Sequence, residues 1–131
     1  MTGELEFIAR DPRDAPEAAG GYTQGLSVRG ARELLFISGQ IPQDRRGVIP
    51  DSFEDQCRMV WRHIDATLDA AGLTLRNLVK VTTYLSSREF AATNSAVRQD
   101  LLGDHRVALT VVVAEIFDPL WLLEIEAIAV A

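Results

Sequence analysis

The chain has 131 residues, a length that suits one domain, and 47% of them are hydrophobic, as in a globular protein rather than a disordered one. The formal net charge is −6 and the lysine and arginine residues are scattered, so no basic stripe is present to meet the phosphates of a nucleic acid. We therefore expect a single domain over residues 1–131 and no nucleic-acid partner.

The first fifty residues are predicted to hold strands and turns. Residues 5–8 indicate a short strand. Residues 22–28 and 34–40 are rich in β-forming side chains, and they predict a hairpin around Gly30. The segment 42–50 contains prolines at both ends and a glycine near its centre, so we expect a loop there.

The clearest helix is predicted to begin after Ser52. The hydroxyl of Ser52 can cap free amides of the first turn, and Asp55 three residues later completes a capping-box pattern. Apolar residues then recur at helical spacing and form one stripe for burial, made of Phe53, Cys57, Val60, Trp61, Ile64, Leu68 and Ala71. Gly72 is expected to end the helix.

The second half of the chain predicts three further strands and one helix. Residues 78–85 are β-rich, a less hydrophobic helix is expected from Ser87 to Gly103, and residues 108–117 and 120–130 indicate two long strands. The resulting order is βββαβαββ. We therefore expect an α+β fold whose mixed, mainly antiparallel sheet has two helices on one face.

One strand predicts an oligomer. The segment 110–114 is apolar without alternation, so both of its faces favour burial. Two helices can cover only one face of the sheet, and the other face is therefore expected to meet another subunit. Closed cyclic symmetry is the usual form of such an assembly.

Several short segments occur in the order and at the intervals typical of one protein family. They are Gly-Gly-Tyr-Thr-Gln-Gly at 20–25, Ser-Gly-Gln-Ile-Pro at 38–42, Glu-Asp-Gln at 54–56, Ala-Ala-Gly-Leu at 70–73, the strand at 78–85, Asn94, and Glu-Ile-Glu-Ala-Ile-Ala at 124–129. Together they resemble the Rid (reactive intermediate deaminase, YjgF-like) family from residue 15 onward. Gly21 stands where the family has a proline.

The resemblance implies a chorismate-mutase-like fold assembled as a homotrimer, with three clefts between neighbouring subunits. It also implies hydrolysis of enamines and imines released by pyridoxal-phosphate enzymes, with no cofactor and no metal. Tyr22, Ser38 and Asn94 correspond to family positions near the cleft. Glu124 corresponds to the residue that positions or activates the attacking water, and Gly39 is expected to offer backbone groups to a ligand beside Ser38.

The chain departs from the family at the arginine that grips the substrate carboxylate. When the family motif is aligned without a gap upstream of Glu124, Leu109 occupies the position of this arginine. An arginine forms two charge-assisted hydrogen bonds to a carboxylate, each contributing about 1.5–3 kcal/mol, so leucine should weaken binding by orders of magnitude. Arg106 is the alternative anchor, although strand alternation points residues three apart in opposite directions unless a turn redirects one of them.

The polar residues of the resemblance also have structural interpretations. Glu124 and Glu126 are two residues apart, so a strand places both on one face. We expect Glu124 to act on water and Glu126 to be a polar residue of a wet interface. The hydroxyl of Tyr22 either contacts a ligand or is satisfied locally, and Ser38 taken alone indicates a turn at a strand end.

Other reactive residues are predicted to be structural. Cys57 is the only cysteine, which excludes an internal disulfide and a cysteine zinc cluster, and its place on the apolar stripe predicts a core residue. His63 and His105 lack metal-ligand spacing and are expected to be surface or satisfied histidines. Lys80 is expected on a polar strand face. The first residues do not resemble a signal peptide and no apolar run is long enough for a bilayer, so we expect a cytoplasmic protein without a membrane partner.

The sequence thus favours a Rid-like enzyme that acts on an enamine or imine, with Glu124 and an ordered water at its chemical centre. Leu109 indicates a substrate without the usual carboxylate, or one that is held differently. Two alternatives stay open for the same reason. The chain is either a small-molecule-binding or interaction protein on the Rid scaffold, or an enzyme of different chemistry recruited to a dedicated pathway.

Overall fold

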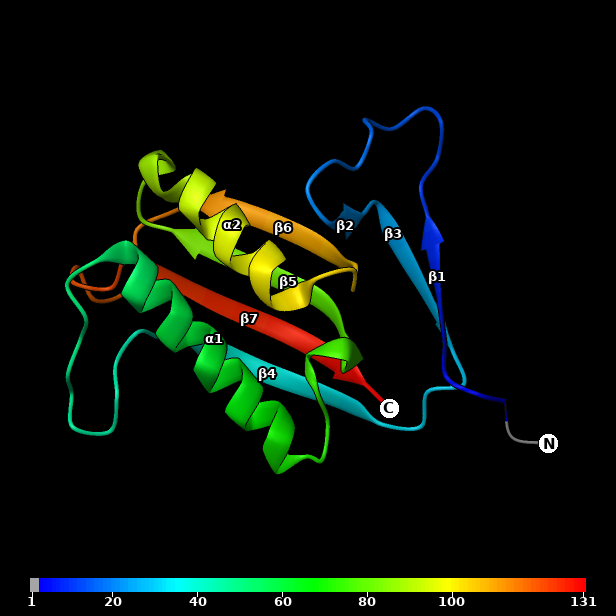
Figure 1. The fold of residues 1–131 in the computed structure, drawn as a ribbon, viewed down its shortest axis with the longest axis horizontal. Coiled ribbons are helices and arrows are strands. Elements are labelled where there is room, and N and C mark those ends of the chain that lie inside the picture. The colour runs from blue at the N-terminus through cyan, green and yellow to red at the C-terminus, as the bar shows by residue number, and fades with distance from the viewer. Residues whose placement is uncertain (1–2) are drawn as a thin grey trace.

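A computed structural model describes residues 3–131 (Figure 1). The elements follow one another as β1 (Glu6–Arg10), β2 (Tyr22–Thr23), β3 (Gly25–Arg29), β4 (Leu34–Gln40), α1 (Phe53–Ala70), η1 (Leu75–Asn77), β5 (Leu78–Leu85), η2 (Arg88–Phe90), α2 (Ala91–Leu102), β6 (Val107–Val113) and β7 (Leu123–Val130), where η denotes a short 3-10 helix. The predicted strand at 78–85 has the predicted bounds.

Five strands form the main sheet, in the spatial order β2-β6-β5-β7-β4. The central strand β5 runs parallel to β6 and antiparallel to β7, while β4 is antiparallel to β7 and β2 is parallel to β6. Both α-helices lie across one face of this sheet (Figure 1). The predicted α+β architecture, a mixed sheet with two helices on one face, is confirmed. We call the sheet face away from α1 and α2 the open face.

Helix α1 forms for the reasons predicted from its sequence. The Ser52 hydroxyl accepts a hydrogen bond from the backbone amide of Asp55 at 3.1 Å, which caps the first turn. The apolar stripe is buried from Phe53 to Leu68, whereas Ala71, the last predicted member, lies beyond the helix and is half-buried. The helix ends at Ala70, and Gly72 follows with a φ of 73°, a conformation that favours glycine.

The predicted hairpin around Gly30 is wrong. Strand β3 pairs with β1 in a separate two-stranded ribbon, and β4 pairs with β7 at the edge of the main sheet. Gly30 has a φ of 79°, and a side chain there would overlap the carbonyl of Glu4, so the chain turns toward β1. Ile37 of β4 is buried in the core under α1, a long-range contact that outweighs local pairing.

The last two strands are shorter than predicted. They span Val107–Val113 and Leu123–Val130, rather than 108–117 and 120–130. Between them the Asp118 side chain accepts a hydrogen bond from the amide of Leu120 at 2.8 Å, and the amide of Trp121 donates to the Asp118 carbonyl at 3.0 Å. These bonds form a turn and use amides that would otherwise extend a strand. Ser87 likewise caps η2, and α2 begins only at Ala91.

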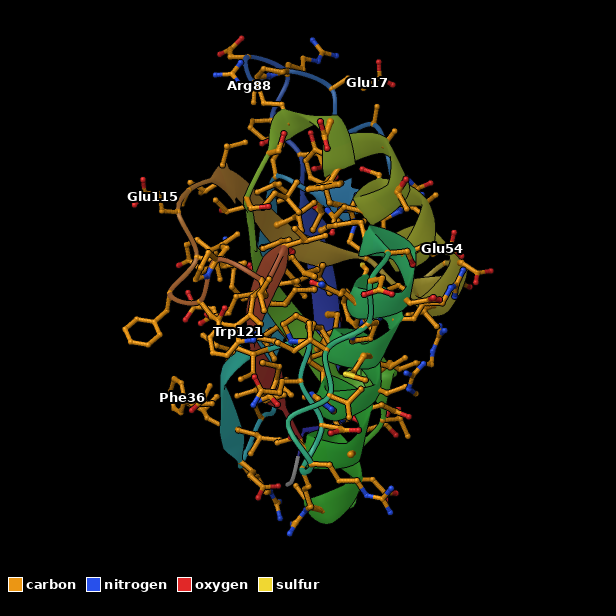
Figure 2. All side chains as sticks on the ribbon, turned by 90° about the vertical axis from the view of Figure 1, so that its left-hand side faces the viewer. Glu17, Phe36, Glu54, Arg88, Glu115 and Trp121 are labelled. Atoms are coloured by element: carbon orange, nitrogen blue, oxygen red, sulfur yellow. The ribbon has the colours of Figure 1, made fainter. Side chains whose placement is uncertain are left out.

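The open face leaves large apolar side chains in contact with solvent. Phe36 of β4 is 70% exposed and Val112 of β6 is 39% exposed on this face, whereas Val111 and Val113, which are 42% and 48% exposed, point to the opposite face of β6. Figure 2 shows Phe36 projecting from the side of the sheet opposite α1. Strands β5 and β7 lie between Phe36 and Val112, so the open face carries exposed apolar side chains on both sides of its centre. The expected homotrimer stays a prediction, since one chain is described.

Candidate functional site

Glu124 lies directly against the backbone of Gly39. A Cβ built on Gly39 would overlap Oε2 of Glu124 and lie 2.8 Å from its Cδ atom. The register between β4 and β7 shifts between Ile37 and Gln40, so an irregularity brings the Gly39 backbone toward β7. The strand irregularity and the missing side chain together create the space that the Glu124 carboxylate occupies.

The two glutamates of β7 have different surroundings. The side chains of Leu123 and Ile125 are buried in the core, so the intervening Glu124 and Glu126 point to the open face, as predicted. The hydroxyl of Tyr84 donates a hydrogen bond to Oε1 of Glu126 at 2.8 Å, and this bond is the main cause that raises the pKa of Tyr84. Within residues 3–131 no side chain donates to Glu124, so its carboxylate can accept a bond from a ligand or a water.

A hollow of about 400 Å³ lies beside these residues on the open face. Its polar wall includes Ser38 and Thr82, together with the Lys80 ammonium, which donates a hydrogen bond to the Thr110 hydroxyl at 2.8 Å. The predicted polar face for Lys80 is confirmed. The complete lining consists of Phe36, Ile37, Ser38, Lys80, Thr82, Glu126, Ala127 and Ile128. The hollow thus combines an apolar floor with two charged groups.

Two other predicted residues lie on the helix side of the sheet. Tyr22 of β2 pairs with Val107, whose side chain is buried in the core. Asn94 of α2 is 2% exposed, and its Oδ1 atom lies 4.0 Å from the sulfur of Cys57 on α1. The predicted set therefore does not form one cluster within one chain. Ser38, Gly39 and Glu124 lie at the open face, while Tyr22 and Asn94 lie on its other side.

Leu109 also lies on the helix side. It pairs with Val81, whose side chain is inaccessible, and it packs against the core. Its neighbour Thr110 faces the opposite way and accepts the hydrogen bond from Lys80. Arg106 precedes β6 and is exposed, whereas Leu109 packs against the core. Arg106 therefore gains no support as a substitute anchor.

A buried arginine that the sequence reasoning missed is Arg98 of α2. It is 4% exposed, and its Nη2 atom donates to the carbonyl of Gly20 at 3.2 Å. Arg98 is four residues after Asn94 and therefore on the same helix face, which was the available signal. An arginine on a helix of low overall hydrophobicity is ordinarily solvent-exposed, so its spacing from Asn94 alone does not predict its burial.

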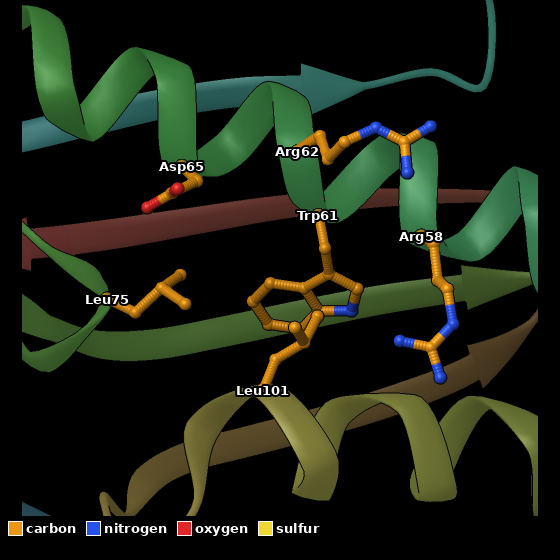
Figure 3. A pocket seen from close by; sticks show the side chains of 6 residues that line it. All are labelled: Arg58, Trp61, Arg62, Asp65, Leu75 and Leu101. Carbon is orange, nitrogen blue, oxygen red and sulfur yellow. The ribbon is translucent and has the colours of Figure 1, made fainter.

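A second pocket lies within the helical layer. It has a volume of about 150 Å³, and Figure 3 shows Trp61 between the arginines of α1 and Leu101 of α2. Its lining residues are Arg58, Trp61, Arg62, Asp65, Leu75 and Leu101. The Arg58 guanidinium already pairs with Glu54 and Asp100, at 3.1 and 3.3 Å. This pocket contains none of the predicted site residues.

Cys57 and the two histidines are structural, as predicted. Burial raises the pKa of the Cys57 thiol to about 12, so the thiolate nucleophile is suppressed. His63 Nδ1 lies 3.1 Å from the carbonyl of Ile41, and His105 Nε2 lies 2.7 Å from that of Leu78. Among residues 3–131 no three histidine, cysteine, aspartate or glutamate side chains gather as metal ligands do. No helix of the described chain has the length and apolarity needed to cross a membrane.

Comparison with known proteins places the geometry in context. A family model described as endoribonuclease L-PSP matches residues 12–131. The RutC family protein PH0854 of Pyrococcus horikoshii is 36% identical over 118 residues, which cover 88% of this chain and 91% of that protein. The 2-iminobutanoate/2-iminopropanoate deaminase of Salmonella typhimurium is 31% identical over 93 residues, 70% of each chain. The crystal structure of Escherichia coli TdcF with bound serine superposes with a TM-score of 0.71 at 31% identity, covering 95% of this chain and 98% of TdcF.

Proposed function

Since the chain belongs to the endoribonuclease L-PSP family, we propose that it hydrolyses a reactive imine or enamine. This family is the Rid family that the sequence motifs resemble. The observation that carries the proposal is the Glu124 carboxylate, seated on Gly39 at the open face and free of side-chain donors among residues 3–131. A relative of this chain bears the name of an imine deaminase, and TdcF binds serine, a small amino acid.

The proposed reaction replaces a C=N bond with a C=O bond. An enamine first takes a proton on carbon and becomes the imine. Water then attacks the carbon of the protonated imine, the π pair of the C=N bond moves to nitrogen, and the Glu124 carboxylate accepts one proton from the attacking water. Glu124 returns this proton to the nitrogen of the carbinolamine, the C–N bond breaks with its electron pair on nitrogen, and ammonia leaves. The hydroxyl loses its remaining proton to the solvent as the C=O bond forms, which replaces the proton that the imine took up. Imine and water are thus converted into a carbonyl compound and ammonia, with no oxidant or reductant.

We propose that the site is completed by a second subunit of a homotrimer. Glu124 and Ser38 lie at the open face, whereas Tyr22 and Asn94 lie on the other side of the same sheet, so one chain cannot direct all four at one ligand. Phe36 and Val112, both exposed on the open face, supply apolar side chains for contact with a neighbouring chain. Residues from two copies would then meet in a cleft between them.

The name of the endoribonuclease L-PSP family raises RNA cleavage as another activity. A formal net charge of −6 opposes binding to a phosphate backbone, and the hollow of the open face includes Glu126. A second candidate function is binding of a small molecule without catalysis. Leu109 favours it, because this residue packs against the core and leaves no carboxylate-binding group at its position. The deamination assay separates this second candidate from the first.

The test measures release of a keto acid from an imine made in place. An amino-acid oxidase generates the 2-imino acid, semicarbazide competes for it, and the wild-type protein should raise the rate of deamination above the spontaneous rate. Glu124→Gln should abolish the increase, because glutamine keeps the shape but cannot accept the proton. Glu115→Gln, at an exposed glutamate outside the hollow, is the matched control and should retain it. Equal rates with and without the wild-type protein would leave only the binding function.

A further inference from the structure

The Arg98 guanidinium is buried without a counter-charge. Its Nε and Nη1 atoms have no hydrogen-bond partner among residues 3–131, and only Nη2 donates, to the carbonyl of Gly20. Burial lowers the pKa of Arg98, yet an arginine keeps its proton at neutral pH. The titratable groups whose charge acts on the pKa of Arg98 are Cys57 and Tyr22, and neither is a carboxylate. A buried charge with unpaired donors is strongly unfavourable unless an anion joins it.

Arg98 lies beside a second buried polar residue and a glycine-containing segment. Asn94 lies one helical turn earlier on the same buried face of α2. The segment that covers the guanidinium runs through Gly20 and Gly21, whose φ values are 101° and 84°, into Tyr22. These positive φ values favour glycine, and a Cβ on either residue would lie 3.4–3.6 Å from the Gln99 side chain, so the segment runs along α2.

We propose that Arg98 binds the carboxylate of a small acid at the candidate site, beneath the segment formed by residues 20–22. The two free N–H groups supply charge-assisted hydrogen bonds to the carboxylate oxygens, and the planar group orients the ligand. Leu109 lies on the same side of the sheet as Tyr22 and Arg98, so the anchor comes from the helix rather than from β6. This inference rests on the proposed function for its substrate class, a 2-imino acid.

The experiment measures binding of pyruvate, a stable 2-oxo acid, and of pyruvamide, its uncharged amide, to the assembled protein by calorimetry. The wild type should bind pyruvate about 10- to 100-fold more tightly than pyruvamide, the factor expected for one or two charge-assisted hydrogen bonds. Arg98→Met should remove this preference. Arg62→Met, which removes an exposed arginine of α1, is the matched control and should keep it. Arg98→Gln, which is neutral but retains a donor for Gly20, provides the same test if the methionine variant does not fold.

Two results would overturn the inference. One is a wild-type protein that binds both compounds equally, and the other is an Arg98→Met variant that keeps the preference. A smaller assembly for Arg98→Met in light scattering, combined with no carboxylate preference in the wild type, would assign the guanidinium to pairing with a second copy. Since pyruvate is not hydrolysed, its binding is independent of turnover. Carboxylate binding without deamination would therefore contradict only the proposed function, while deamination unchanged in Arg98→Met would contradict only the role of Arg98.

Discussion

Replacing Gly39 with alanine perturbs the candidate site at the point where Glu124 meets β4. The new Cβ would overlap Oε2 of Glu124 and stand 2.8 Å from its Cδ atom, well inside van der Waals contact. Because Glu124 is only partly buried, its carboxylate can rotate away from the backbone rather than force the two strands apart. The substitution should therefore displace the carboxylate while β4 and β7 remain paired.

The magnitude follows from that displacement. A misplacement of about 1 Å costs roughly 100-fold in rate, which corresponds to about 2.7 kcal/mol in the activation free energy. The free energy of unfolding should change by less than about 1 kcal/mol, since alanine also lowers the entropy of the unfolded chain. The measurements are kcat/KM for imine hydrolysis and urea unfolding. Gly25→Ala is the control, because a Cβ on Gly25 makes an ordinary 3.4 Å contact with Arg10.

A double-mutant cycle identifies the cause. If Gly39 acts only by seating the Glu124 carboxylate, Gly39→Ala should lower kcat/KM in the wild type but have little further effect in a Glu124→Gln background. Full activity of Gly39→Ala with unchanged stability would refute the reasoning. So would a loss of activity of equal size in both backgrounds, because it would show that the alanine acts on another group.

Three further outcomes are expected. Phe36→Asp, which replaces an exposed apolar side chain of the open face with a charge, should reduce the mass of the proposed homotrimer in light scattering, whereas an unchanged mass would remove Phe36 from the proposed interface. Because the folded-state pKa of Cys57 is about 12 against 9.0 ordinarily, its contribution to stability is present below pH 9 and lost between 9 and 12, by about 1.4 kcal/mol per pH unit. Urea unfolding of Cys57→Ala should lack that slope. Leu109→Arg should lower the free energy of unfolding by about 1–3 kcal/mol, because the guanidinium enters the helix-facing core, and an equally stable variant would contradict the packing of Leu109.

The sequence by itself determined the elements whose signals are local. Ser52 marks the start of a helix with one apolar stripe, and Gly72 marks its end. The structure has the capping hydrogen bond of Ser52 and buries the stripe. Alternation along β7 was sufficient to place Glu124 and Glu126 on the same face. Such properties depend on a period of 3.6 or 2 residues and on the chemistry of a single turn, so neighbouring residues contain all the necessary information.

The tertiary structure alone decided which elements meet. A period shows which residues share a face but not what covers that face, so the pairing of β4 with β7 instead of β3 could not be predicted from either strand. The same holds for Gly39 against Glu124, which are 85 positions apart, and for Arg98 beneath Gly20. Contacts of this kind depend on the packing of a whole layer of core side chains. The same packing buries Arg98, which an isolated α2 would expose to solvent.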